Sequence, residues 1–185
     1  MTLEQQLQGI NIYLVGMMGA GKSTVGKVLA RELGYRFFDT DDLIGRVTGR
    51  SIPEIFETDG EAGFRTWESQ VLGELCSYRR LVVATGGGIV IEQMNWSYLR
   101  HGIVIWLDVP PDRLFDRLQG DTSRPLLQHP DPLGRLKDIL EQRRSRYAQA
   151  DLSFTIENDD TPEEISQRIL TRIPKILKAT PMSSS

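Results

Sequence analysis

Hydrophobic residues along the chain fall into two patterns that alternate. Short apolar runs, rich in β-branched residues, are typical of strands buried on both faces of a parallel sheet. They predict strands at residues 10–15, 35–38, 81–84, 103–107 and 152–156. Between them, apolar residues recur with helical spacing over residues 22–33, about 61–78 and 162 onwards. Because each return to a parallel strand needs a crossover, this order predicts an α/β fold with helices on both faces of the sheet.

Helix ends are marked by capping residues. Ser51 with Glu54 forms a capping box, and Thr161 with Glu164 forms another ahead of the last helix, where a proline occupies the first turn. Pro174 is expected to kink or end that last helix.

Two segments lack either pattern. Residues 119–134 contain several prolines and glycines and show little periodicity, and a loop of that length is typically a lid or disordered. Residues 179–185 form a small, polar tail that we expect to be disordered.

Composition narrows the class of protein. A length of 185 residues favours one domain, 1–185, large enough to bury a core without disulfides. The net charge of −3, from 22 basic and 25 acidic residues, argues against nucleic acid or a membrane surface as partner. Cys76 is the only cysteine, which excludes an internal disulfide framework and a cysteine zinc cluster. With no apolar run of membrane-spanning length and no signal pattern at the N-terminus, we expect a cytoplasmic protein.

Residues 16–23, GMMGAGKS, match the phosphate-loop pattern G-x-x-x-x-G-K-[ST]. They directly follow a predicted strand and open a predicted helix, where glycines let successive backbone N–H groups surround phosphate oxygens. Lys22 can reach the β- and γ-phosphates, and the Ser23 hydroxyl can bind Mg²⁺. An ordinary glycine turn is the alternative, but the complete motif in this context indicates a nucleoside triphosphate site.

A magnesium site of this kind needs a carboxylate at a second strand end. Asp108 follows an apolar run and is one candidate, while Asp39 and Asp41 follow another predicted strand. In extended backbone, Asp39 and Asp41 share one face and aim two carboxylates at a single site. Each could instead be a helix cap or a turn residue.

The chain lacks the Asn-Lys-x-Asp motif of regulatory GTPases and is short for a motor or transporter ATPase. A small-molecule or nucleotide kinase remains. The motifs at residues 16–23, 39–41 (DTD), 59–65 (DGEAGFR), 86–88 (GGG) and 124–127 (RPLL) then occur in an order that closely resembles the shikimate kinase family. The resemblance covers about residues 10–170 and implies a three-layer P-loop sandwich with a five-stranded parallel sheet in the order 2-3-1-4-5, helices on both faces and a mobile lid.

The resemblance implies a role for each matching residue. Asp39 matches the position that holds Mg²⁺ through water, with Ser23 as the other metal ligand, and Asp108 becomes a structural strand-end residue. Asp41, Lys22 and Arg124 match the catalytic positions, Asp41 at the acceptor hydroxyl and Arg124 in the lid. The positions implied for ATP are Gly19, Ala20, Gly21, Lys22, Ser23, Thr24, Arg117 and Arg124, and those for shikimate are Asp41, Arg65, Gly87, Gly88 and Arg143.

The residues themselves leave some roles open. Glu61 and Glu68 lie on the same helical face as Arg65, so the three could form a surface ladder of ion pairs, or the carboxylates could hold Arg65 ready for an anionic ligand. Arg143 lies in a basic helix whose charges are usually solvated. The three glycines could be a flexible turn or a place where substrate touches backbone.

Together these observations predict an ATP- and Mg²⁺-dependent kinase that phosphorylates the 3-hydroxyl of shikimate, acting as a monomer on two small molecules. A related sugar-acid kinase, such as a gluconate kinase, and a nucleotide-binding regulator without activity are the alternatives. The joint presence of Asp41, Arg65 and Arg124 argues against the regulator, because a protein that only binds a nucleotide does not need all three.

Overall fold

The computed structural model describes residues 2–121, 128–157 and 160–179. Its strands are β1 (Ile12–Val15), β2 (Arg36–Asp39), β3 (Leu81–Ala84), β4 (Ile103–Asp108) and β5 (Leu152–Thr155). Its helices are α1 (Leu3–Leu7), α2 (Lys22–Leu33), α3 (Thr40–Thr48), α4 (Ile52–Leu75), α5 (Gln93–Leu99), α6 (Pro111–Leu118), α7 (Pro132–Tyr147) and α8 (Pro162–Ala179). Each strand predicted from the apolar runs is present, with ends that differ by one or two residues at most places.

The strands form one parallel sheet in the order β2-β3-β1-β4-β5, as predicted. β1 lies at its centre, and every residue of β1 and β3 is buried, which explains why these segments are continuously apolar rather than alternating. β5, at one edge, alternates buried and exposed residues because only one of its faces is covered.

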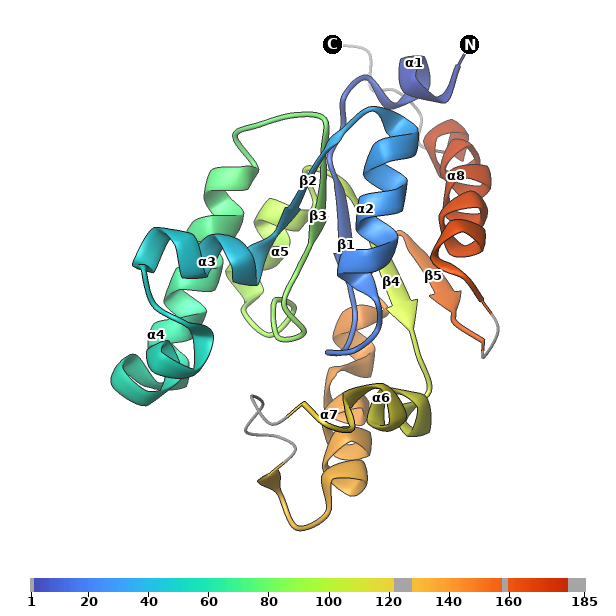
Figure 1. Cartoon of the computed structure of the whole chain (residues 1–185). Helices are drawn as coiled ribbons and strands as arrows, with labels where there is room; N and C mark the ends of the chain where they lie inside the picture. Colours follow the sequence, from blue (N-terminus) through green and yellow to red (C-terminus); the bar gives the residue numbers. More distant parts are fainter. Residues whose placement is uncertain (1, 122–127, 158–159, 180–185) are drawn as a thin grey trace.

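Helices cover both faces of the sheet (Figure 1). Right-handed crossovers place a helix on one face when the chain moves one way along the sheet and on the other face when it moves back. The connection through α2 runs opposite to those through α4, α5 and α7, so α2 lies on the face opposite these three helices, and α8 packs beside α2. Within the described ranges, no helix combines the length and apolar composition that crossing a membrane would need.

Two expectations about helices need correction. The long helix α4 begins at Ile52 rather than near residue 61, and it contains a kink at Gly60, whose φ of 71° is not helical. Of the two effects expected of Pro174, an end of the helix does not occur, since α8 runs through this residue to Ala179. Ile169 and Ile173, one turn apart, are fully buried, so packing against the core holds the helix across the missing N–H of the proline.

A close approach of two chain segments at the start of β4 yields a first prediction. A Cβ atom at Gly102 would lie 2.5 Å from the Asn11 carbonyl oxygen and 2.6 Å from the Tyr13 ring. Gly102→Ala should therefore lower the free energy of unfolding by about 1–3 kcal/mol, the usual cost of overpacking, as measured by urea denaturation.

The matched control is Gly45→Ala in α3. A Cβ atom there meets only the Arg50 carbonyl oxygen, at an ordinary 3.6 Å. Alanine is the better helix former, so this variant should be equally stable or more stable by up to about 1 kcal/mol. Equal losses in the two variants would contradict the steric explanation.

Candidate active site

The carboxyl ends of parallel strands meet at one edge of the sheet, and the predicted site residues gather there. One cavity of about 230 Å³ is lined by the phosphate loop on one side and by the ends of β2 and β3 on the other. In an open α/β sheet, ligands bind at this edge, beside the strand where the topology reverses, which here is β1. The lining residues are Met18, Gly19, Ala20, Gly21, Lys22, Ser23, Thr24, Asp39, Asp41, Thr85, Gly86 and Gly87.

The phosphate loop needs its glycines for conformation and for space. Gly16, Gly19 and Gly21 have φ values of 144°, 77° and 89°, which side chains rarely tolerate. A Cβ atom at Gly16 would also lie 2.6 Å from the Leu107 carbonyl oxygen in β4. Lys22 is buried in the first turn of α2, where its ammonium donates to the carbonyl oxygens of Gly16 at 2.7 Å and of Met17 at 2.8 Å.

The two aspartates reach the cavity in a different way from the one the sequence predicted. Asp39 ends β2 and caps α3, accepting the N–H of Asp41 at 2.9 Å, so Asp41 lies in the first helical turn and not in extended backbone. The prediction that Asp39 and Asp41 share a face of an extended segment is therefore wrong, although both residues line the same cavity. The second oxygen of Asp39 accepts a hydrogen bond from the Ser23 hydroxyl, which joins the cap to the phosphate loop.

Asp108 is not part of this cavity. Its carboxylate lies 3.9 Å from the Arg144 guanidinium, and partial burial raises its pKa while Arg144 opposes the rise. Asp39 and Asp41 line the cavity beside the phosphate loop, and Asp108 does not. The alternative that Asp108 supplies the carboxylate there is therefore not supported.

Arg65 is held by two carboxylates of α4. Its guanidinium contacts Glu68 at 2.7 Å and Glu61 at 3.3 Å. Glu68 is fully buried and the Arg65 side chain is 14% exposed, whereas the Glu61 side chain is 66% exposed. The Arg65–Glu68 pair is therefore not part of a solvated surface ladder, and only the pair with Glu61 lies at the surface. Burial raises the pKa of the Glu68 carboxyl and Asp41 adds to the rise, while Arg65 and Arg143 oppose it.

The three glycines after β3 allow these charged groups to approach the backbone. A Cβ atom at Gly88 would overlap the guanidinium of Arg65, and one at Gly86 would lie 2.7 Å from the Glu68 carboxylate. At Gly87 it would lie 3.6 Å from Arg143 and 3.2 Å from the Met18 nitrogen of the phosphate loop. Gly86 and Gly88 are thus required for close packing, and the loop lies close to both Arg65 and Arg143.

One further predicted residue, Arg117, lies beside the phosphate loop. Arg117, on α6, donates to the Gly19 carbonyl oxygen at 3.0 Å, and burial lowers its pKa, with a smaller effect from Arg113. Arg124 lies outside the described residues, as does most of the central part of the predicted lid.

Sequence reasoning missed one element of the site. Thr40, fully buried at the start of α3, accepts the N–H of Gly86 at 3.0 Å and so joins the β2 end to the glycine loop. A threonine between two aspartates carries no local signal of such a contact, because its partner is distant in sequence.

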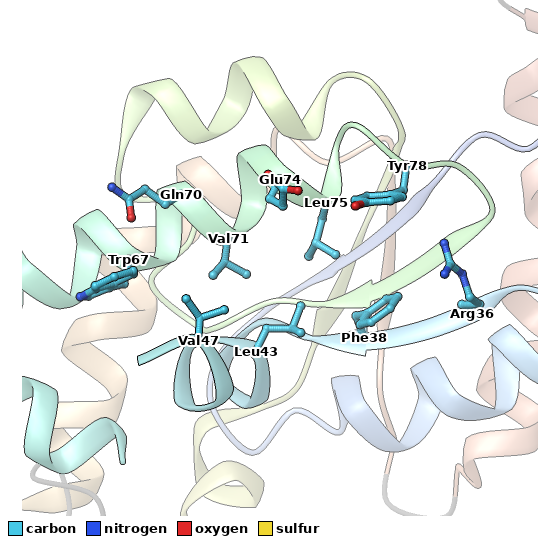
Figure 2. Close-up of a pocket in the computed structure, with 10 residues that line it drawn as sticks. All are labelled: Arg36, Phe38, Leu43, Val47, Trp67, Gln70, Val71, Glu74, Leu75 and Tyr78. Atoms are coloured by element: carbon cyan, nitrogen blue, oxygen red, sulfur yellow. The ribbon is translucent and has the colours of Figure 1, made fainter. Parts of the chain in front are cut away.

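A second hollow, of about 580 Å³, opens between β2, α3 and α4 (Figure 2). Its walls are mainly apolar and include Phe38, Leu43, Val71 and Leu75. No phosphate-loop residue and none of the predicted site residues lines it. A third hollow, of about 660 Å³, includes Arg65 and Glu61 but no phosphate-loop residue. The smaller polar cavity, which the phosphate loop lines, is therefore the candidate active site.

A phosphate loop facing two aspartates, with a pair of arginines close by, on a 2-3-1-4-5 parallel sheet, defines a P-loop kinase of small molecules. Comparison with known proteins identifies the family more closely. A model of the family described as shikimate kinase matches residues 18–174, and the chain belongs to this family.

Similar proteins span its whole length. The shikimate kinase of Synechococcus elongatus PCC 7942 is 60% identical over 100% of this chain and 97% of that protein. The shikimate kinase of Nostoc sp. PCC 7120 is 58% identical over 94% of this chain and 96% of that protein. The structure of the Acinetobacter baumannii shikimate kinase in complex with shikimate superposes with a TM-score of 0.89 at 42% identity, covering 95% and 98% of the two chains.

The chain is accordingly an enzyme that phosphorylates shikimate, a step in the biosynthesis of aromatic amino acids. A gluconokinase from Sinorhizobium meliloti has a TM-score of 0.60 at 18% identity, covering 96% and 98% of the two chains, which shows a common fold alone. The gluconate kinase and inactive regulator interpretations are therefore set aside by the family to which the chain belongs.

Arg65 offers a test of the site. Arg65→Lys keeps the charge but loses the planar fork that can bind a carboxylate with two parallel hydrogen bonds. We expect shikimate affinity to fall about tenfold to a hundredfold, the effect of losing one charge-assisted hydrogen bond, while ATP affinity is unchanged. Calorimetry with each ligand measures both.

Arg50→Lys is the matched control. Arg50 contacts Asp59 with two hydrogen bonds, of 3.0 and 2.7 Å, and neither residue lines any of the three hollows. The Arg50→Lys variant loses the same fork geometry, but its shikimate affinity should stay at the wild-type value. If Arg65→Lys also leaves shikimate affinity unchanged, Arg65 has only a structural role.

Proposed function

We propose that this chain transfers the γ-phosphoryl group of ATP to the 3-hydroxyl of shikimate, with Mg²⁺ bound beside the phosphate loop. The observation that carries the proposal is the single cavity lined by Lys22, Ser23, Asp39, Asp41 and the glycines after β3. Phosphoryl transfer needs little covalent chemistry from a protein, so positioning and charge neutralisation by such a set are sufficient.

The donor set suits Mg²⁺. The Ser23 hydroxyl and the Asp39 carboxylate are joined by a hydrogen bond next to the phosphate loop, and hard oxygen ligands in small number are what Mg²⁺ takes from proteins when it keeps several waters. We assign Ser23 as a ligand and Asp39 as a residue that holds the ion through water. The bound ion would neutralise negative charge on the phosphates.

The phosphates would be bound by the N–H groups of the loop, by the N-terminal end of α2 and by the Lys22 ammonium. This ammonium is already directed into the loop by the Gly16 and Met17 carbonyl oxygens, so binding requires only that it exchange these partners for phosphate oxygens. Arg117, fixed to the Gly19 carbonyl oxygen, lies where the nucleoside would extend from the loop. Arg124 is assigned to the transferring phosphoryl group on the sequence resemblance.

Shikimate would lie on the other side of the cavity. Arg65 and Arg143 supply two positive charges for its carboxylate beside Gly87 and Gly88, and the fixed guanidinium of Arg65 loses little freedom on binding. Asp41, across the cavity from the phosphate loop, is the group that would orient the acceptor hydroxyl and accept its proton.

The proposal extends to the organisation of the protein: one kinase domain over residues 1–185, a monomer in the cytoplasm whose partners are ATP and shikimate rather than nucleic acid or a membrane. Its support is the length, the charge balance and the composition of the chain.

The reaction itself is tested by measuring ADP release with each acceptor. Shikimate should cause ADP formation that depends on Mg²⁺ and stops when the metal is chelated, and the product should carry phosphate at the 3-hydroxyl by NMR. Gluconate and AMP serve as control acceptors and should give no ADP above background. Equal turnover with gluconate, or phosphate on another hydroxyl, would refute the proposal.

Asp41 separates catalysis from nucleotide binding. Asp41→Asn keeps the shape but removes the charged proton acceptor, so kcat should fall about a hundredfold, toward the lower end of what acid–base groups contribute, because the transition state is loose. The dissociation constant of ATP should not change. Steady-state kinetics with a separate ATP titration measures both.

Lys22→Ala is the contrasting variant, because it removes the phosphate contact itself and should impair ATP binding and turnover together. If Asp41→Asn retains near-normal kcat, Asp41 is only a residue of the helix start. If it abolishes ATP binding instead, Asp41 rather than Asp39 is the principal metal carboxylate.

A further inference from the structure

The loop between β3 and α5 carries the glycines of the site and is held by side chains from two helices. From α5, Asn95 donates to the Ile89 carbonyl oxygen at 2.8 Å and Trp96 to that of Val90 at 3.2 Å. From α7, Arg146 donates to the Ile91 carbonyl oxygen. These three contacts fix the part of the loop that is remote from the cavity.

Tyr147, the last residue of α7, holds the part that lines the cavity. Its hydroxyl donates to the Gly87 carbonyl oxygen at 2.6 Å. Among the described side chains, it is the only one with a hydrogen bond to a carbonyl group of the three glycines. A Cβ atom at Gly87 would contact both the Met18 nitrogen of the phosphate loop and the Arg143 guanidinium, so the position of Gly87 affects both halves of the site.

The Tyr147 hydroxyl is itself rigidly placed. The side chain is fully buried, and its ring stacks on Trp106 of β4 with a centroid separation of 5.6 Å and an interplanar angle of 21°. Burial raises the pKa of Tyr147, with an opposing effect from the adjacent Arg143, so the hydroxyl keeps its proton and remains a donor at neutral pH. Arg143 precedes Tyr147 by one helical turn, which places both side chains on the same face of α7.

We propose that Tyr147 is a positioning residue for the acceptor: its hydrogen bond to Gly87 fixes the glycine loop relative to Arg143 and the phosphate loop, and so sets the place where shikimate binds. This inference rests on the proposed function, because the Gly87 loop is taken there as one wall of the shikimate site. Tyr147 acts through the loop and has no assigned contact with either substrate.

Tyr147→Phe removes the hydroxyl and keeps the ring on Trp106. The KM for shikimate should rise roughly threefold to tenfold, the affinity equivalent of one ordinary hydrogen bond, while the KM for ATP stays within about twofold of the wild type. Hydrogen exchange without ligand should be faster at the amides of residues 87–91. This second measurement does not depend on activity.

Tyr13→Phe is the matched control. Tyr13, in the central strand β1, is also fully buried. Its hydroxyl has hydrogen-bond partners in Cys76, at 3.2 Å, and in Asn11, which directly precedes β1. A loss of buried hydroxyl contacts in general would lower the stability of both variants, whereas only Tyr147→Phe should change the KM for shikimate and the exchange in residues 87–91.

The outcomes separate the two proposals. Normal wild-type turnover of shikimate with an unchanged shikimate KM in Tyr147→Phe overturns this inference and leaves the proposed function intact. An equal rise in both KM values also overturns it, because Tyr147 would then support the whole site rather than the acceptor side. Absence of wild-type turnover with shikimate refutes the proposed function, and this inference with it.

Discussion

At the carboxyl edge of the sheet, two buried threonines join three strands whose sequence positions are far apart. Thr85 donates to the Leu14 carbonyl oxygen of β1 through its backbone N–H, at 3.1 Å, and its hydroxyl, at 2.8 Å. Thr40 accepts the N–H of Gly86 at 3.0 Å, which attaches the end of β2 to the end of β3. The phosphate loop begins shortly after Leu14, Asp39 and Asp41 flank Thr40, and the glycine loop directly follows Thr85. Buried hydrogen bonds of this kind leave an unsatisfied polar group when broken, so they define one arrangement of the edge and not several.

Local signals in the sequence predict most of the fold. The strands are apolar on both faces, and α2 has the predicted bounds because Gly21 and Gly34 adopt the left-handed conformation at its two ends. The capping box at Ser51 marks the start of α4, but the helical spacing predicts the helix only from about residue 61, because Gly60 interrupts that spacing. Pro174 does not end α8, because buried neighbours in the fold outweigh the local propensity of proline to stop a helix.

Among the site residues too, those in a contiguous motif can be assigned from the sequence, and those that depend on distant contacts cannot. The phosphate loop is a contiguous motif whose function follows from its own backbone, so its residues can be assigned from the sequence. The spacing of Arg65 and Glu68 predicts that they are neighbours but cannot tell a solvated pair from a buried one, because burial depends on the loop after β3. Asp39 and Asp41 share a cavity through a helix cap, a geometry that depends on where α3 begins. The chemistry of a contiguous motif can thus be predicted from the sequence, whereas contacts between loops that are distant in sequence cannot.

The buried carboxylate of Glu68 gives the site its electrostatic character. Removing this charge from water is costly, and the ion pair with Arg65 offsets that cost without a large net gain in stability, so the contribution of the pair is to specify one geometry. Arg65 contacts Glu68 through one nitrogen and Glu61 through another, and both carboxylates belong to α4, the helix that carries Arg65. Arg143, from α7, lies beside Gly87 of the same loop. In the proposed function, these two guanidinium groups, one fixed by its own helix and one supplied by another helix, would hold the substrate anion only while the glycine loop beside them keeps its place. The hydrogen bonds of that loop would then matter to anion binding as much as the charges do.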